Sequence, residues 1–598
     1  MTVIGLPEDV SDVCPLALGF SSLYKMGLTN ETLHAKKGVQ KSDQGSFPDN
    51  IPVIVTDMGC WPEAPGGVSN CRRDLVNGHS TIDNHVVAEC NNEYGVLRYP
   101  VKKSVRSLKR LPLWGLDSVT ADHGIINNLS QSQVDDKSAD THLARDVQGY
   151  FVPLLRTFVR HARCKIPSRA SMTECRDVLV SMSEYFERKD YAKTWDSEQT
   201  EQAWIEAWIQ PLDPSRYTNY CGKASEISLE SPSLSDLREA LASYRTLFFI
   251  LSVTIPQDGD ACPRVFQASH HGFGSMLGLV LKYRRGVNLA VWDHAILWRE
   301  SLLHLSPAQS HLPLFVQSAM LAGMRLVGQL AYFHADVVMP CTSTFNPLWE
   351  TEIGTDQGRL TSRQLFHRKI EPVVNGIGNM AAFKPTPPQE VQTTRPTVVM
   401  LSHVQPIKGI RPAIEAADVI VNTWGFRDYQ LLIYGAIDQP GEYQVLTSSV
   451  NDQQSGYAWE ISRLIVQRGL GDNVHLKGLS SDATKALKNA WIFMNSSLSE
   501  GLPLAVGEAG LTGVPLVVTD VGSTAQVLTD PETKQRKSAS LDSGNGGNMD
   551  KVYGRGYWQD GAYADISHHR SRYGILGKAN GGTRRRPAKA RLAWPSSH

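Results

Sequence analysis

Apolar runs of strand length recur in two parts of the chain and are separated by segments whose apolar residues have helical spacing. In the first part, a helix from Met276 to Gly286 separates two such runs, and this order predicts a parallel pair of strands. Residues 115–235 are more polar, and we interpret them as an insertion with helical pieces such as 147–162. The runs predicted as strands in this part are 51–57, 263–269, 287–292 and 335–341.

A second part with regular alternation follows the proline-rich segment 383–396, which has the composition of an interdomain linker. Five strands that alternate with helices specify a doubly wound parallel sheet. The sequence therefore predicts an α/β fold class with two Rossmann-like, doubly wound domains and a ligand held in a cleft between them. The strands predicted here are 397–402, 429–435, 474–476, 491–495 and 515–519.

The chain divides on this basis into four segments. The final segment is rich in glycine, serine and aspartate and has no apolar periodicity, so we expect a disordered or aberrant tail. The predicted segments are an irregular N-terminal piece at 1–45, an N-terminal domain at 46–385, a C-terminal domain at 386–534 and the tail at 535–598.

Charge and composition exclude several functions. The 598 residues include 60 Lys+Arg and 60 Asp+Glu, so the formal net charge is zero. This balance argues against binding nucleic acid or an anionic membrane over a wide surface. The nine cysteines contain no CxxC pair, which indicates neither a disulfide scaffold nor a metal site and favours a reducing compartment.

The N-terminal residues and the longest apolar run indicate the location. The first twenty residues lack the basic region and apolar core of a signal peptide. The longest apolar run, 247–255, is much shorter than the ~20 residues of a membrane-spanning helix. We therefore expect a cytoplasmic protein.

The segment SSLSEGLPLAVGEAGLTGVPLVVTD (496–520) carries the clearest chemical signal. A loop presents Glu500, and Pro503 suits the first position of a helix that stops near Gly513. Glu508 then lies inside this helix, and the free N–H groups at the helix start can bind an anion. Two carboxylates beside a phosphate site fit a nucleotide-sugar. Two solvated glutamates remain the alternative.

A second strand, turn and helix occupy MLSHVQPIKGIRPAIEAA (400–417), with His403 just past the strand and Lys408 at the turn. A lysine in this place can reach a diphosphate, and a protonated histidine can assist it. A merely solvated lysine is the alternative that the spacing leaves open.

The spacing Glu500-x7-Glu508 within EGLPL, followed by GVPLVVTDVGS, resembles the C-terminal half of the family 4 retaining glycosyltransferases. The segment PIKG (406–409) agrees, and VVNGIGNMAAFKP (373–385) is similar to the hinge of that family. The resemblance is good over residues 260–530 and weaker over about 50–110.

The N-terminal half narrows the resemblance. CWPEAPGGVSN (60–70) and VWDHAILWRE (291–300) resemble the bacterial Pel exopolysaccharide glycosyltransferase and its fungal relatives. The family implies the GT-B arrangement of two facing Rossmann-like domains, a UDP-sugar as donor substrate, retention of anomeric configuration, and neither a metal nor another cofactor.

The resemblance also implies roles for single residues. Glu508 is implied to bind the donor ribose, Glu500 the transferred sugar, and Lys408 the diphosphate. Glu500 and His294 are the implied catalytic residues, although His294 is equally interpreted as a structural histidine. The residues implied to complete the donor site are His403, Gly66, Gly67, Gly501, Leu502 and Leu504.

Three departures from the family pattern leave a second hypothesis open. His403 stands where the family usually has arginine, Gly378 replaces the hinge aspartate, and the closing C-terminal helices are not recognisable. The alternative is a catalytically impaired, nucleotide-sugar-binding relative that lacks those helices.

The expected partners follow from the resemblance. They are a UDP-sugar, with glucose as the first sugar to consider, and a glycan or small-molecule acceptor. A membrane synthase or exporter is a candidate protein partner. Nucleic acid is not, because the basic block at 584–591 is too short to support it.

Overall fold

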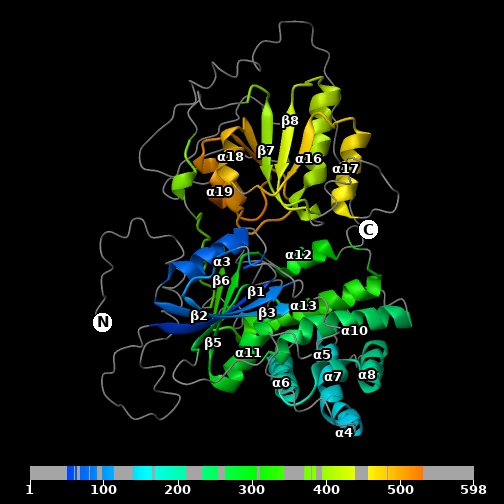
Figure 1. Ribbon diagram of the computed structural model, residues 1–598. Helices are drawn as coiled ribbons and strands as arrows, with labels where there is room; N and C mark the ends of the chain where they lie inside the picture. The colour runs from blue at the N-terminus through cyan, green and yellow to red at the C-terminus, as the bar shows by residue number, and fades with distance from the viewer. Residues whose placement is uncertain are drawn as a thin grey trace.

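The computed structural model contains two parallel sheets in two lobes, each sheet covered by helices on both faces (Figure 1). This confirms the predicted α/β, doubly wound fold class. The predicted segment 1–45, the tail 535–598 and part of the linker lie outside the described residues. The described residues are 50–58, 61–63, 67–79, 81–90, 97, 99–112, 139–163, 169–210, 232–253, 263–295, 297–305, 310, 312–342, 369–378, 380–385, 393–437, 456–480 and 482–528.

The first sheet has the strand order β3-β2-β1-β4-β5-β6, and all neighbouring strands are parallel. Four of its strands lie at the runs predicted from the sequence, whereas β2 and β3 are additional. The strands are β1 (Ile51–Met58), β2 (Ile82–Cys90), β3 (Val105–Pro112), β4 (Val265–Ala268), β5 (Asn288–Asp293) and β6 (Val337–Pro340).

Side chains alternate between the two faces of this sheet, as strand geometry requires. Val53 and Val55 of β1 pack in one buried cluster and Ile54 in the other. The first face is covered by α3 and the second by α11 and α13, while α12 lies on the side towards the second lobe (Figure 1). These helices are α3 (Gly67–Gly78), α11 (Gly274–Arg285), α12 (Leu297–His304) and α13 (Leu314–His334).

The polar region between β3 and β4 folds into helices that extend the core of the second face. The predicted helix at 147–162 is present, with its first turn a π-helix. The other helices of this region were not predicted, because their polar exposed faces weaken the apolar pattern. Two of them nevertheless begin after an N-cap serine, Ser197 or Ser233, which is a common residue in that position. The elements are α4 (Ala139–Asp146), η4 (Val147–Phe151), α5 (Val152–Ala162), α6 (Arg169–Phe186), α7 (Tyr191–Trp195), α8 (Glu198–Ile209), α10 (Leu234–Phe248) and η6 (Phe249–Ser252).

Helix α13 has the length and apolar character of a membrane span, and no other helix in the described parts of the chain does. However, 67% of its most apolar 18-residue window is buried inside the protein. It packs in the core of the first lobe beside α11 and α10.

The second sheet has the order β11-β10-β7-β8-β9 and is also entirely parallel, with all five strands at predicted positions. Its strands are β7 (Thr397–Leu401), β8 (Gln430–Tyr434), β9 (Val474–Gly478), β10 (Ile492–Asn495) and β11 (Leu516–Val518). The other elements are η9 (Met380–Ala382), η11 (Pro406–Lys408), α16 (Ile410–Asp418), η12 (Val419–Thr423), α17 (Tyr457–Gln467), α18 (Ala483–Lys488), α19 (Leu504–Leu511) and α20 (Thr524–Val527).

The helix that follows Glu500 differs slightly from its prediction. Pro503 is the N-cap of α19 rather than its first residue, and the helix ends at Leu511. Gly513 follows with a φ of 73°, the left-handed conformation that stops a helix.

Candidate functional site

The predicted site residues follow the carboxyl ends of strands in both sheets. His294 comes directly after β5, Lys408 lies between β7 and α16, and Glu500 lies between β10 and α19. Ligands of open parallel sheets bind at this edge, because the loops there converge. The fold therefore places residues from distant parts of the sequence on loops that can share one ligand.

The two edges meet directly at Gly501 and His294. A β-carbon on Gly501 would lie 1.8 Å from the main-chain oxygen of His294, so a glycine is required for this approach. Next to it, a β-carbon on Gly67 would be in ordinary contact with the Leu504 side chain, at 3.4 Å. The structure thus brings together four residues that the resemblance assigns to the site.

Glu500 is held by two hydrogen bonds. Lys408 Nζ donates to Glu500 Oε1 at 2.8 Å, and the Ser497 hydroxyl donates to the same oxygen at 2.7 Å. The approach of the two loops depends on Gly409, which has a φ of 62° and whose β-carbon would lie 1.9 Å from the Ser496 carbonyl oxygen. The lysine therefore reaches the site already paired with a carboxylate.

Glu508 lies one turn into α19, past the helix start. Its carboxyl group has neither a hydrogen-bond nor an ion-pair partner in the described part of the chain, and burial raises its pKa from 4.5 to about 6. The first N–H groups of α19 have no partner within the helix. The start of α19 therefore offers N–H donors, and Glu508 offers a carboxyl acceptor one turn further along the same helix.

His294 is buried and neutral. Burial chiefly, with His270 and Arg72 adding to it, holds its pKa well below the usual 6.5. Its Nδ1 lies 3.0 Å from Asn375 Nδ2, which assigns the acceptor role to Nδ1 and the proton to Nε2. Nε2 is buried without a partner among the described residues. His294 therefore has an N–H group free for a ligand.

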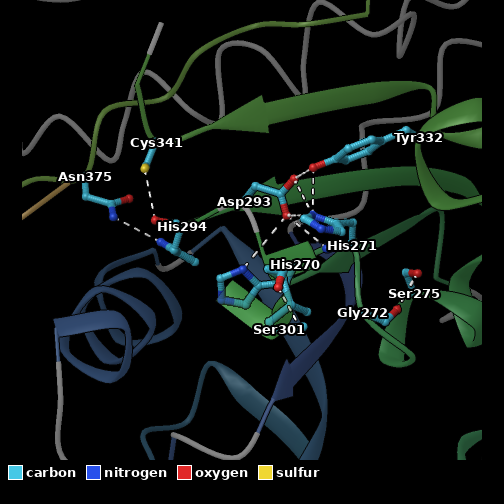
Figure 2. Close-up of polar contacts among 11 residues, drawn as sticks. His270, His271, Gly272, Ser275, Asp293, His294, Ser301, Tyr332, Cys341 and Asn375 are labelled. Carbon is cyan, nitrogen blue, oxygen red and sulfur yellow. Dashed lines mark hydrogen bonds and ion pairs between the residues drawn. The ribbon is translucent and has the colours of Figure 1, made fainter. Parts of the chain in front are cut away.

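Asp293 fixes the loops on which the histidines lie (Figure 2). Its carboxylate accepts hydrogen bonds from the backbone N–H of His271 at 2.9 Å, from the His271 ring at 3.0 Å, and from the Tyr332 hydroxyl. These bonds join β4, β5 and α13, and His271 holds the pKa of Asp293 below its usual value despite burial, which opposes it.

Glu300 of α12, in the first lobe, is a third carboxyl group of the site beside Glu500 and Glu508 of the second lobe. Burial raises its pKa from 4.5 to about 7; Lys408 opposes this rise and Glu500 adds to it. Because the charges of Lys408 and Glu500 act on it, Glu300 belongs to the same electrostatic site.

His403 is arranged differently from the prediction of a protonated histidine. Its Nδ1 accepts a hydrogen bond from the backbone N–H of Ala436 at 3.2 Å. A protonated ring could not accept this bond, so the geometry favours the neutral form.

The remaining predicted residues are Gly66, Gly67 and Leu502, and the structure describes two of them. Gly66 lies outside the described residues, whereas Gly67 begins α3 beside Leu504. Leu502 lies between Gly501 and the start of α19. The roles assigned to all these residues remain predictions.

Sequence reasoning gave no role to Glu300, Asn375 or Asp293. Two signals were present. Asp293 ends a buried strand directly before His294, and Asn375 opens the segment that resembles the family hinge. Glu300 had no such signal, because its electrostatic interaction with Lys408 and Glu500 depends on how α12 meets η11. In the described parts of the chain, no group of three or more His, Cys, Asp or Glu side chains could hold a metal ion.

The residues that form the second sheet and its loops match a known family of proteins. Residues 385–536 match the family described as "Glycosyl transferases group 1". Residues 52–358, more than half of the chain, match "Domain of unknown function (DUF3492)", and the chain belongs to this family. No curated protein matches the chain by sequence.

Several solved structures are similar at low identity. Sucrose-phosphate synthase from Thermosynechococcus elongatus is 13% identical with a TM-score of 0.43, over 81% of this chain and 84% of that one. HepE from Anabaena in complex with UDP and glucose is 12% identical with a TM-score of 0.39, over 80% of this chain and 83% of that one.

A second match to HepE, in complex with UDP, is 18% identical with a TM-score of 0.31. It covers 45% of this chain and 62% of that one, which is less than two thirds of its length. Similarities this weak do not define a reaction.

Proposed function

We propose that this protein is a retaining glycosyltransferase of family 4, related to the Pel exopolysaccharide enzyme, that transfers a sugar from a UDP-sugar to a glycan or small-molecule acceptor. The observation that carries the proposal is the Lys408–Glu500 pair beside the start of α19, against the backbone of His294. The match of residues 385–536 to glycosyl transferases group 1 supports the same function.

The donor would be bound by groups whose chemistry fits its parts. Lys408 and the free N–H groups at the start of α19 would bind the diphosphate, since both present positive charge. Glu508 would accept hydrogen bonds from the ribose hydroxyls. Glu500 would bind hydroxyls of the transferred sugar, and the Nε2–H group of His294 would donate a hydrogen bond to a hydroxyl of the acceptor.

The reaction follows from these positions. The bond between the anomeric carbon and the β-phosphate oxygen breaks, and its electron pair leaves with UDP. The acceptor oxygen bonds to the anomeric carbon from the same face, and its proton passes to the departing phosphate. Lys408 and the α19 start stabilise the negative charge that develops on the diphosphate. In this proposal no metal or other cofactor takes part.

The cell compartment and partners belong to the same proposal. A UDP-sugar donor and reduced cysteines fit the cytoplasm, and a membrane synthase or exporter would receive a polysaccharide product. Cys71, Cys90, Cys175 and Cys341 are buried.

The test combines binding and turnover on the full chain. Calorimetry should detect the binding of UDP to the protein. When acceptors are added, the protein should release UDP from UDP-glucose or from another UDP-sugar. Mass spectrometry of extracts incubated with isotope-labelled UDP-sugars would identify the product. UDP binding without release from any donor would favour the binding-only relative, and no UDP binding by folded protein would refute both hypotheses.

A further inference from the structure

His270 has a backbone conformation that side chains rarely adopt. Its φ is 142°, and it is the only non-glycine residue with positive φ among those that the structure describes. Such a conformation costs stability and persists where the surroundings impose it, most often at functional sites. A glycine would relieve the strain, so the imidazole of His270 needs an explanation.

The ring of His270 lies close to both Asp293 and His294 (Figure 2). Its centroid is 5.3 Å from that of His294 in an edge-on arrangement, and its Nδ1 is 3.9 Å from Asp293 Oδ1. The side chain is only 13% exposed, and Nδ1 is buried without a hydrogen bond in the described part of the chain. Packing alone would not select an imidazole here.

Other polar atoms without partners lie close by. His294 Nε2, Arg72 Nη2 and Ser269 Oγ are all buried and lack a partner among the described residues. Arg72 lies over the ring of Trp292 at 5.5 Å, and that ring is 4.4 Å from the ring of His294. Buried polar atoms in native proteins nearly always have partners, so this cluster indicates a place for a polar ligand.

The charges of the cluster limit what that ligand is. Arg72 Nε is bound to Asp57 Oδ2 at 3.1 Å, and His271 Nδ1 to Asp293 Oδ1 at 3.0 Å. Burial lowers the pKa of His270 to about 4, and the pKa of His294 is also well below its usual value. Arg72 and His271 are therefore each already paired with a carboxylate.

A phosphate or carboxylate group would enter this cluster without an unpaired cation to meet it, close to Asp293. A hydroxyl group can instead donate to one imidazole nitrogen and accept from another without adding charge. The arrangement therefore suits an uncharged molecule with several hydroxyl groups.

We propose that His270 is a specificity-determining residue that, together with His294, receives a hydroxyl of an uncharged sugar or polyol acceptor and selects it over phosphorylated acceptors. This inference rests on the proposed glycosyl transfer and adds the acceptor class. The strain at His270 is then explained by a role in binding the acceptor.

The first test is His270→Gly in the full chain, with His475→Ala on β9 as a control outside the cluster. The variant should melt at a higher temperature, because the strain is relieved, and lose at least tenfold in kcat/KM for a neutral acceptor. UDP affinity and acceptor-free hydrolysis of UDP-glucose should stay within twofold. An unchanged acceptor KM would overturn the proposal, as would a joint loss of stability and UDP binding.

The second test compares matched acceptors on the wild-type protein saturated with UDP. Calorimetry and UDP-release assays would use glucose against glucose 6-phosphate, and maltose against maltose 1-phosphate. The neutral compound of each pair should be favoured at least tenfold, and equal or better use of the phosphorylated compound would overturn the inference. Failure of the wild type to bind UDP would refute the proposed function instead, so the two failures are distinguishable.

Discussion

The backbone of Gly501 lies directly against the main-chain carbonyl of His294, so closely that a β-carbon at residue 501 would be 1.8 Å from the carbonyl oxygen. This contact joins the loop before α19 to the loop after β5, and so joins the two lobes at the site. A second glycine makes a similar close approach: a β-carbon on Gly522 would be 1.9 Å from the Glu500 carbonyl oxygen. The position of Glu500 is thus fixed by backbone on both sides.

Gly501→Ala should reduce turnover at least tenfold, because the added methyl group forces the Glu500 loop away from His294. A displacement of about 1 Å at a catalytic group is enough for such a loss. UDP release from UDP-glucose measures it. Gly471→Ala is the matched control, since a β-carbon at Gly471 meets nothing within 4 Å. Equal activity of the two variants would show that the 501 loop does not position the chemistry.

Glu508→Gln and Glu500→Gln should separate the two carboxylates. If Glu508 holds the ribose, its loss weakens UDP itself by roughly 1–3 kcal/mol, the size of a charge-assisted hydrogen bond. If Glu500 touches only the transferred sugar, its replacement lowers turnover and leaves UDP affinity nearly intact. Calorimetry with UDP and rates with UDP-glucose distinguish the roles. The exposed Glu415→Gln is the control, and equal loss of UDP affinity in both site variants would contradict the assignment.

Strands that form a clear apolar run between glycine, proline or polar residues were predictable from the sequence, whereas β2 and β3 were not. β5 is almost wholly apolar and buried, and it is bounded by Gly286 and His294. β2 has three polar residues in a row after Ile82, and the side chain of one of them, Asn84, donates a hydrogen bond to the Ser104 carbonyl oxygen. β3 is an edge strand with charged side chains. Their apolar pattern is too weak to identify them without the sheet beside them.

The site was predictable where one segment carries it and not where distant segments meet. The order of Glu500, the helix start and Glu508 could be read from the sequence, because all three lie in one loop and helix. The ion pair of Lys408 with Glu500 depends on how Gly409 lets two loops approach. The electrostatic interaction of Glu300 with Lys408 and Glu500 depends on the arrangement of the lobes, which no local spacing encodes.

Tyr332→Phe should destabilise the protein by about 1–3 kcal/mol, because it removes one of the hydrogen bonds that the buried carboxylate of Asp293 accepts. Urea unfolding at pH 7 measures the change. Tyr150→Phe is the control, since Tyr150 is 68% exposed. The pKa of Asp293 is below 3.8 in the folded protein, so its stabilisation is present above that pH and declines as the pH falls through the folded value. A stability equal to that of the control would argue that Asp293 is satisfied by other groups.

Glu300→Gln should change how UDP binding depends on pH. The pKa of Glu300 is about 7, so its proton is lost as the pH rises through neutrality and a second negative charge appears beside Lys408 and Glu500. The diphosphate of UDP would then meet stronger repulsion. UDP affinity of the wild type should fall several-fold between pH 6 and 8, and that of the variant should stay nearly constant.

The same pKa makes a separate prediction for stability. Because the folded value of Glu300 is raised from 4.5 to about 7, the folded state holds this proton more tightly than the unfolded chain does. Its contribution to stability is therefore greatest below pH 4.5 and is lost as the pH rises to 7. Relative to the wild type, Glu300→Gln should gain stability towards a denaturant between pH 5 and pH 8, whereas the exposed Glu415→Gln should not. If the variant and the wild type have parallel pH profiles for both UDP affinity and unfolding, Glu300 does not titrate near neutrality, and its carboxylate is already ionised beside Lys408.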